Sequence, residues 1–251
     1  MKTRSHKQDS QVIVYDAGRI EQPGSELFDA DFWAERGAVA GEATGRGNAL
    51  FLDTPFGPAV LRKYLRGGQA ARVSRDRYLF TGYERSRPVA EYRMMEQLSG
   101  KGLPVPKPLA AICQREGAYY TGALMTRRIV NVQALADLVG SKCFEGSLWR
   151  AVGSTIRLFH AQGVVHADLN ARNILVTPDN QVYLIDFDRA RIRPGDARAF
   201  RANLKRLRRS LDKFWPVESA DRLEDCWRML TEGYEEGAGG QCAGGPGHLY
   251  G

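Results

Sequence analysis

The pattern of apolar residues changes once along this 251-residue chain, and that change limits the folds available to it. Between about residues 37 and 125 the apolar runs are short and are separated by glycine turns, which is typical of antiparallel strands. Beyond Arg128 the apolar residues recur at helical spacing, as Leu148 and Ile156 do. We therefore predict an α+β protein with two lobes, in which a small antiparallel sheet precedes a mainly helical part.

The expected elements follow from this pattern and from the turn residues between the runs. Strands are expected at 12–15, 38–42, 49–53, 59–64, 108–113 and 118–125, with a hairpin over 174–185. Helices are expected at 27–36, 89–98, 132–139, 146–161, 196–214 and 218–235, and a loop over 66–89. The predicted domains are a leader of one strand and one helix (1–36), a β-rich nucleotide-binding lobe (37–128), a helical catalytic lobe (129–235) and a disordered glycine-rich tail (236–251).

Composition excludes several classes of protein. Hydrophobic residues make up 43% and charged residues 26% of the chain, as in ordinary globular proteins. No run approaches 18 apolar residues, and the N-terminal MKTRSHKQDSQ lacks the apolar segment of a signal peptide, so we expect a cytoplasmic protein. The four cysteines form no CxxC pair and are expected to be reduced. The formal net charge of +7 favours an anionic partner such as a nucleotide, nucleic acid, phospholipid or phosphorylated sugar.

Two segments carry the chemistry: HADLNARNIL at 166–175 and LIDFD at 184–188. They place Asp168 and Asn173 five residues apart in a polar loop, and Asp186 at the end of a short apolar run. A carboxylate and an amide oxygen brought together across a hairpin suit Mg²⁺, which prefers oxygen ligands. A second carboxylate nearby is suited to accept a hydroxyl proton. These are the groups that phosphoryl transfer requires.

The alternative is that Asp and Asn here only form turns, which is their commonest role outside catalysis. The occurrence of histidine, aspartate, asparagine and a DFx triplet at protein-kinase offsets favours the functional interpretation. His166 is expected to order the loop rather than to move protons.

The first half of the chain offers candidate nucleotide contacts. The GxG of Gly45, Arg46 and Gly47 lies between two expected strands, where bare backbone can approach phosphates. The next strand carries Arg62 and Lys63, and because neighbouring residues of a strand point to opposite faces, only one of the two can face the nucleotide. Glu91, on the following expected helix, is the natural partner of whichever cation points inward.

The two motifs together, placed after a strand-rich half, resemble the catalytic core of the protein-kinase-like superfamily. Within it the chain resembles the lipopolysaccharide kinase family, which includes bacterial kinases of 3-deoxy-D-manno-octulosonic acid (Kdo). Unlike typical Ser/Thr protein kinases, it has Asn170 where a lysine is usual, and Asp188 in place of the DFG glycine. The matching segments cover about residues 30–215 and are FWAE (32–35), GRG (45–47), LRKYLRGG (61–68), DRYLFTGYERSR (76–87), VPKPLAA (105–111), HADLNARNIL, LIDFDRA (184–190) and NLKRLRRSL (203–211).

The resemblance implies a bilobal kinase-like fold that uses ATP and Mg²⁺. It implies Asp168 as the base and Asn173 and Asp186 as the metal ligands. It also implies phosphorylation of the 4-hydroxyl of Kdo on Kdo-lipid IVA, at the cytoplasmic face of the inner membrane. Arg62 fits the common pattern of the family, while the choice between Arg62 and Lys63 stays open.

The partner expected from the resemblance is an anionic glycolipid, a Kdo-containing lipid A precursor. Many arginines are available to bind such an acceptor through charge-assisted hydrogen bonds. We expect no nucleic acid and no obligate protein partner. The alternatives are a kinase of another acceptor, such as a heptose or an aminoglycoside-like molecule, and an inactive nucleotide-binding or nucleic-acid-binding protein. The arginines considered are Arg66, Arg72, Arg75, Arg77, Arg85 and Arg87 in the long loop, and Arg189, Arg191 and Arg193 after LIDFD.

The expected helix at 201–215 is amphipathic and basic. Its apolar stripe is predicted to pack on the core of the helical lobe, with the basic face available to lipid headgroups. Peripheral contact with the membrane is therefore expected. The stripe consists of Leu204, Leu207, Leu211 and Phe214, and the basic face of Arg201, Lys205, Arg208, Arg209 and Lys213.

Overall fold

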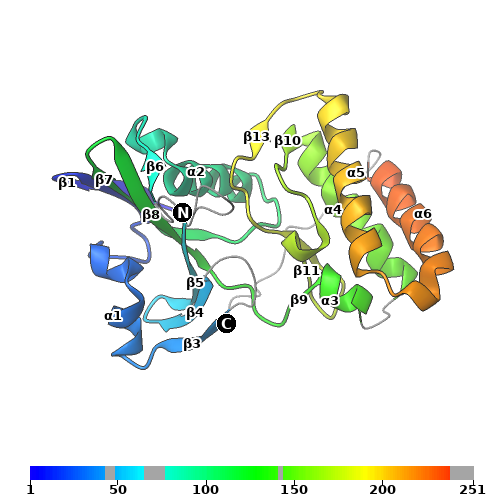
Figure 1. Cartoon of the computed structure of the whole chain (residues 1–251), viewed down its shortest axis with the longest axis horizontal. Helices are drawn as coiled ribbons and strands as arrows, with labels where there is room; N and C mark the ends of the chain where they lie inside the picture. Colours follow the sequence, from blue (N-terminus) through cyan, green and yellow to red (C-terminus); the bar gives the residue numbers. More distant parts are fainter. Residues whose placement is uncertain (43–48, 65–76, 141–143, 238–251) are drawn as a thin grey trace. The chain divides into compact units, whose positions relative to one another are not determined.

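A computed structural model of the chain describes residues 1–42, 49–64, 77–140 and 144–237. The chain divides into two compact units. Among the described residues, the first contains Met1–Gly100 and Pro106–Arg128, and the second contains Lys101–Val105 and the residues from Ile129 to Gly237. The first is built on a sheet and the second mainly from helices (Figure 1). The predicted α+β class is therefore confirmed.

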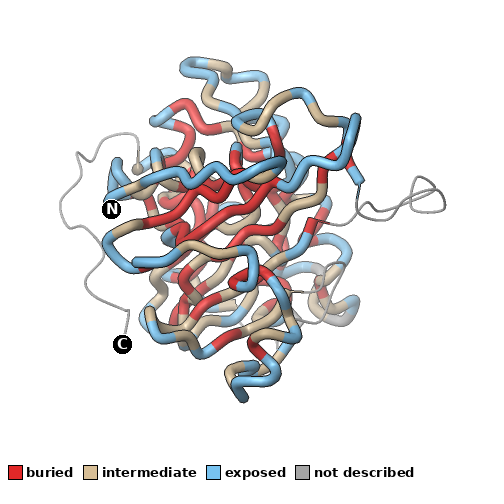
Figure 2. Tube along the Cα trace, turned by 90° about the vertical axis from the view of Figure 1, so that its left-hand side faces the viewer, coloured by how far each residue is buried: buried red, intermediate tan, exposed pale blue. Residues whose placement is uncertain are grey.

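The first unit is an eight-stranded antiparallel sheet with the order β1-β2-β7-β8-β5-β4-β3, in which β6 also pairs with β8. Figure 2 shows the buried stretches running along its inner strands, whereas β1 is exposed. The strands are β1 (Thr3–Gln8), β2 (Gln11–Asp16), β3 (Val39–Glu42), β4 (Ala49–Thr54), β5 (Gly57–Lys63), β6 (Tyr78–Leu79), β7 (Pro108–Glu116) and β8 (Tyr119–Arg127). The helical segments are η1 (Ser25–Phe28), α1 (Ala30–Ala34), η3 (Tyr83–Arg85) and α2 (Arg87–Gly100).

The two faces of this sheet are covered by different segments. On one face, Ala59 and Leu61 of β5 lie in a core cluster with Phe28 and Trp33 of the N-terminal helical turns. The other face is covered by α2, which contacts β7 and β8. Because side chains alternate along a strand, Arg62 lies on the face covered by α2.

Several sequence expectations for the first unit need correction. The helix expected at 27–36 is instead η1 followed by α1, because the extended backbone of Asp29 separates them and its side chain caps α1. The leader strand expected at 12–15 is β2, but β1 was not predicted, since TRSHKQ has no apolar alternation. The loop expected over 66–89 contains β6, η3 and the start of α2 within its described part.

Within its described residues the second unit contains three long helices, whose bounds agree with the predicted ones to within two residues. Its core includes Trp149, Phe159 and Phe187, and the rings of the two phenylalanines stack at 5.7 Å. The segment expected to form a helix at 132–139 is instead a short strand, which pairs with β11 (Ile174–Val176), followed by a helix. The elements are β9 (Gln133–Ala134), α3 (Leu135–Gly140), α4 (Gly146–Ala161), β10 (Val164–Val165), η4 (Ala171–Asn173), β11 (Ile174–Val176), β12 (Val182–Leu184), β13 (Arg191–Ile192), α5 (Ala197–Phe214), η5 (Val217–Ser219) and α6 (Ala220–Glu236).

Helices α4 and α6 pack closely because each presents a glycine to the other. A Cβ at Gly153 would collide with the backbone of Leu230, and one at Gly233 would collide with the backbone of Arg150. Any larger side chain at these positions would therefore force the two helices apart.

Helix α5 packs its apolar stripe on the core of the second unit, as predicted. Leu207 and Leu211 are fully buried, while Leu204 and Phe214 are partly buried. In the ranges that the structure describes, no helix combines the length and apolarity needed to cross a bilayer.

Candidate active site

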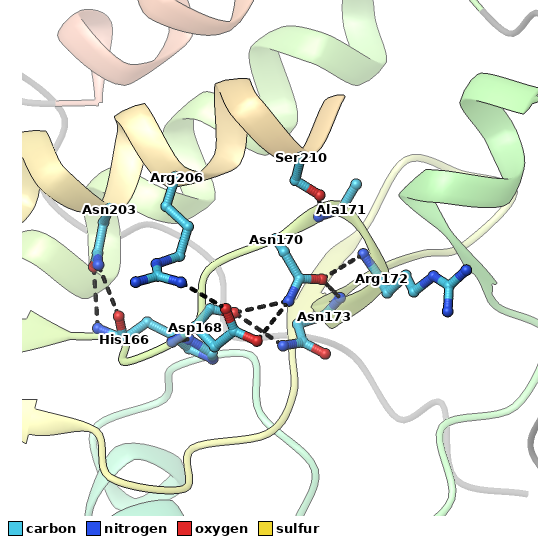
Figure 3. A network of polar contacts seen from close by, with 9 residues as sticks. All are labelled: His166, Asp168, Asn170, Ala171, Arg172, Asn173, Asn203, Arg206 and Ser210. Carbon is cyan, nitrogen blue, oxygen red and sulfur yellow. Dashed lines mark hydrogen bonds and ion pairs between the residues drawn. The ribbon is translucent and has the colours of Figure 1, made fainter. Parts of the chain in front are cut away.

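The loop between β10 and β11 carries the HADLNARN sequence and is held in shape by Asn170. The Asn170 side-chain oxygen accepts hydrogen bonds from the backbone N–H of Arg172 (2.9 Å) and Asn173 (3.2 Å) and caps the 3-10 turn η4. Its amide nitrogen donates to a carboxylate oxygen of Asp168 at 3.0 Å. A single asparagine thus shapes the turn and orients the candidate base (Figure 3).

Helix α5 anchors this loop through side chains spaced three and four residues apart. Asn203 binds both the backbone N–H (3.0 Å) and the carbonyl (2.7 Å) of His166. Ser210 Oγ accepts from the backbone N–H of Ala171 at 3.1 Å. Between them, Arg206 donates to Asp168 Oδ1 at 3.1 Å. One face of α5 therefore lies along the loop and fixes it at three points (Figure 3).

His166 ties the loop to the segment that follows β12. Its Nδ1 accepts from the backbone N–H of Asp168 at 3.1 Å, which requires Nε2 to carry the proton that bonds the Ile185 carbonyl at 2.9 Å. Burial lowers the pKa of His166 and keeps the ring neutral. These contacts support the expectation that His166 orders the loop.

Asp168 itself remains accessible. Its side chain is 59% exposed, yet both carboxylate oxygens have a donor, Arg206 on Oδ1 and Asn170 on Oδ2. The carboxylate is thereby held in one orientation while lone pairs remain to accept a further proton. A base needs this combination of fixed direction and access.

Asn173 and Asp186 fit the oxygen set that a magnesium–nucleotide complex uses. The Asn173 amide nitrogen donates to the Asp168 carbonyl at 2.9 Å, which turns its side-chain oxygen away from the loop (Figure 3). The Asn173 carbonyl accepts from the Ile185 N–H at 3.0 Å, and this bond brings the backbone leading into Asp186 beside it. One amide and one carboxylate oxygen, completed by phosphate oxygens, are a usual ligand set for Mg²⁺.

Asp186 lies two residues beyond β12 rather than at its last position. Its backbone is left-handed (φ 65°), a conformation that aspartate tolerates better than most residues. The turn places the next residue, Phe187, in the core against Phe159 and His166. The buried ring of Phe187 therefore fixes the position of the preceding residue, the candidate metal ligand Asp186.

In the first unit, Arg62 is the cation that pairs with Glu91. Arg62 Nη2 lies 2.5 Å from Glu91 Oε2, and the Tyr64 hydroxyl also donates to this carboxylate. The Glu91 side chain is buried, whereas Lys63 is exposed and lies on the opposite face of β5. Arg62, and not Lys63, is therefore the partner of Glu91. The predicted contacts at 45–47 lie outside the described residues.

The contacts made by Asn203, Arg206, Ser210 and Tyr64 were not predicted from the sequence. A signal was present for two of them, because Asn203 and Ser210 are polar residues at helical spacing on the face of α5 that also buries Leu207 and Leu211. A polar residue on a buried helix face needs a partner. Nothing in the local pattern distinguishes Arg206 from the other basic residues of this helix.

The anchored Asp168 loop and the adjacent candidate oxygen ligands have the arrangement expected of the catalytic half of a kinase-like phosphotransferase. A comparison with protein families identifies the family within this class. Residues 30–234 match the lipopolysaccharide kinase (Kdo/WaaP) family, and the chain belongs to that family. It is therefore a kinase with ATP as its phosphoryl donor, and the predicted kinase-like fold is confirmed.

Three similar proteins carry the same name. The chain is 46% identical over 224 residues to the 3-deoxy-D-manno-octulosonic acid kinase of Xanthomonas euvesicatoria pv. vesicatoria (strain 85-10). It is 46% identical over 227 residues to the enzyme of that name in Xanthomonas oryzae pv. oryzae (strain PXO99A). It is 44% identical over 226 residues to that of Stenotrophomonas maltophilia (strain R551-3). Each match covers 89% of both chains.

Proposed function

We propose that this kinase transfers the terminal phosphoryl group of ATP to the 4-hydroxyl of Kdo on Kdo-lipid IVA, a lipid A precursor. The names of its relatives support Kdo as the sugar that is phosphorylated. The observation that carries the chemistry is the Asp168 carboxylate, which is exposed to a substrate but held by donors on both oxygens.

In this mechanism Asp168 orients the acceptor hydroxyl and accepts its proton as the oxygen attacks phosphorus. Asn173 and Asp186 would hold Mg²⁺, which would supply positive charge to neutralise the phosphates. Arg62, whose direction is set by Glu91, contacts the nucleotide phosphates. The GxG of Gly45, Arg46 and Gly47 is assigned to the same nucleotide from its sequence, because bare backbone can approach phosphates. His166 and Asn203 take no part in proton transfer but hold the loop that carries the base.

The direct test is transfer of label from [γ-³²P]ATP to Kdo-lipid IVA in the presence of Mg²⁺, with mono- and di-Kdo acceptors compared. We expect wild-type protein to label a Kdo lipid, and Asp168→Asn to lose activity by about 10²–10⁴-fold, the usual contribution of a general base. Asp225→Asn is the matched control, because Asp225 is also an exposed aspartate that pairs with an arginine.

The outcomes separate the hypotheses. Label on neither lipid, with ATP still bound, would reject the Kdo acceptor, and a heptose acceptor would be the next to test. Label from Asp168→Asn at the wild-type rate would reject Asp168 as the base. Equal rates with and without a metal chelator would reject Mg²⁺.

We also propose peripheral contact between the exposed face of α5 and an anionic membrane. Exposed cations recur there every three or four residues over about 22 Å of helix, opposite the buried stripe. Such a row suits the negative headgroups of a bilayer surface. The residues are Arg198, Arg201, Lys205, Arg209 and Lys213.

This contact is tested by co-sedimentation with phosphatidylglycerol vesicles at low salt. We expect binding that weakens as salt is added, and weaker binding by a variant with alanine at Lys205, Arg209 and Lys213. Equal binding by the variant and the wild type would show that α5 is not the contact surface. Phosphatidylcholine vesicles serve as the uncharged control.

A further inference from the structure

A cation lies directly beside the candidate base, and the fold does not require it there. Arg206 and Asp168 form an ion pair at 3.1 Å, although their side chains are 47% and 59% exposed. Ion pairs at this exposure contribute little to stability because water and salt screen them. The loop is already anchored by Asn203 and Ser210 on either side of Arg206. A contact with the substrate would account for the position of Arg206.

Most N–H groups of the Arg206 guanidinium make no hydrogen bond to the described residues. It carries five N–H groups in one plane, and among the described residues its hydrogen bonding is to Asp168 alone, through Nη1. In Figure 3 the side chain descends from α5 with the guanidinium alongside the carboxylate. A planar group with free parallel donors is suited to bind the two oxygens of a carboxylate.

Two other arginines of this unit, Arg172 and Arg208, contact groups other than Asp168. The Arg172 guanidinium points away from Asp168 and lies 5.0 Å from the centre of the Phe214 ring (Figure 3). Arg208 pairs with Asp212 and Glu224. Asn170, which follows Asp168 by two residues, is uncharged. Among the described residues of this unit, Arg206 is therefore the cation in contact with the candidate base.

The acceptor proposed above is a sugar acid, and its carboxylate poses an electrostatic problem. The hydroxyl to be phosphorylated must reach Asp168, which brings two negative groups to within the width of one sugar ring. Like charges at that separation repel each other. A guanidinium that contacts both carboxylates removes the repulsion and fixes the orientation of the sugar.

We propose that Arg206 is a specificity-determining residue that binds the carboxylate of the sugar-acid acceptor while it remains beside Asp168. The proposal rests on the proposed function, because it concerns the same acceptor. It gives the enzyme a means to reject neutral sugars, which would leave the charged guanidinium without its second partner.

The test compares two acceptors that differ only in this charge: Kdo-lipid IVA, and the same lipid with its Kdo carboxylate converted to an uncharged amide. We measure kcat/KM for both with wild type, Arg206→Ala, Arg206→Lys and Arg228→Ala. Arg228 is the matched control, because it is an exposed arginine of the same unit that pairs with an aspartate at 3.3 Å. Circular dichroism and thermal unfolding verify that each variant is folded.

We expect wild type and Arg228→Ala to prefer the carboxylate by about 10- to 100-fold, the usual effect of charge-assisted hydrogen bonds. In Arg206→Ala the preference should nearly disappear, mainly through a loss with the acid acceptor. Arg206→Lys should keep part of the preference, since it retains the charge without the planar pair of donors.

Four results would overturn the inference. A preference that survives intact in Arg206→Ala would show that another group reads the carboxylate. Equal losses of kcat with both acceptors would assign Arg206 to positioning Asp168 alone. Equal rates of wild type on acid and amide would reject carboxylate recognition while leaving the Kdo kinase function in place. Transfer to neither acceptor by wild type would instead reject the proposed function, and the inference with it.

Discussion

Asn203 is one of three residues by which α5 holds the loop that carries Asp168, and its removal should lower both the stability and the rate. In Asn203→Ala the backbone N–H and carbonyl of His166 both lose their buried partners. Each buried polar group left unsatisfied costs about 1–3 kcal/mol, so we expect the free energy of unfolding to fall by about 3 kcal/mol. Ser210→Ala is the graded control, because it removes a single bond, to the Ala171 N–H, and should cost about 1 kcal/mol.

Urea unfolding followed by tryptophan fluorescence measures this difference in the relevant part of the chain. Three of the four tryptophans, Trp149, Trp215 and Trp227, belong to the second unit. In the folded variant kcat should fall by about 10- to 100-fold, since a shift of about 1 Å in a catalytic group can have that effect. The interpretation fails if Asn203→Ala loses no more stability than Ser210→Ala. An unchanged kcat would show that the loop keeps its position without this clamp.

Three further predictions concern other parts of the molecule. Glu91→Gln should raise the KM for ATP by about 10-fold, because Arg62 loses its charged partner, and a KM unchanged in steady-state kinetics would argue against a nucleotide role for Arg62. Gly153→Ala should lower the free energy of unfolding by about 1–3 kcal/mol, because the new methyl group collides with α6, and an increase in the urea midpoint would contradict the packing described. Burial lowers the pKa of His160 to about 4, so the unfolded chain binds this proton more tightly between pH 6.5 and 4, and stability should fall as the pH is lowered. Between pH 7 and pH 5 His160 should lower the free energy of unfolding by about 2 kcal/mol. Unfolding of wild type and His160→Gln at both pH values measures this difference. An equal pH dependence of the two proteins would contradict the prediction.

Local patterns were enough to predict the long elements of this chain. The helices α4, α5 and α6 follow from apolar spacing and capping signals, and the strands β3, β4, β5, β7 and β8 largely follow from short apolar runs between glycine turns. The elements that were missed have weak local signals. Strand β1 is polar along its length, and its conformation depends on pairing with β2. Strand β9 is two residues long and is defined by β11, about forty residues away.

The same division applies to the candidate site. The sequence alone placed Asp168, Asn173 and Asp186 in a kinase-like motif, because their chemistry depends on residue type and short spacing. It could not choose between Arg62 and Lys63, since the choice depends on which face of β5 is covered by α2.

Nor could the sequence place Arg206 beside Asp168, from which it is separated by 38 residues. Contacts at that separation are set by how a helix packs against a loop, and neither segment specifies that packing by itself. The sequence thus determined the candidate groups for phosphoryl transfer, and the tertiary structure decided which cation and which helix face hold the candidate base Asp168.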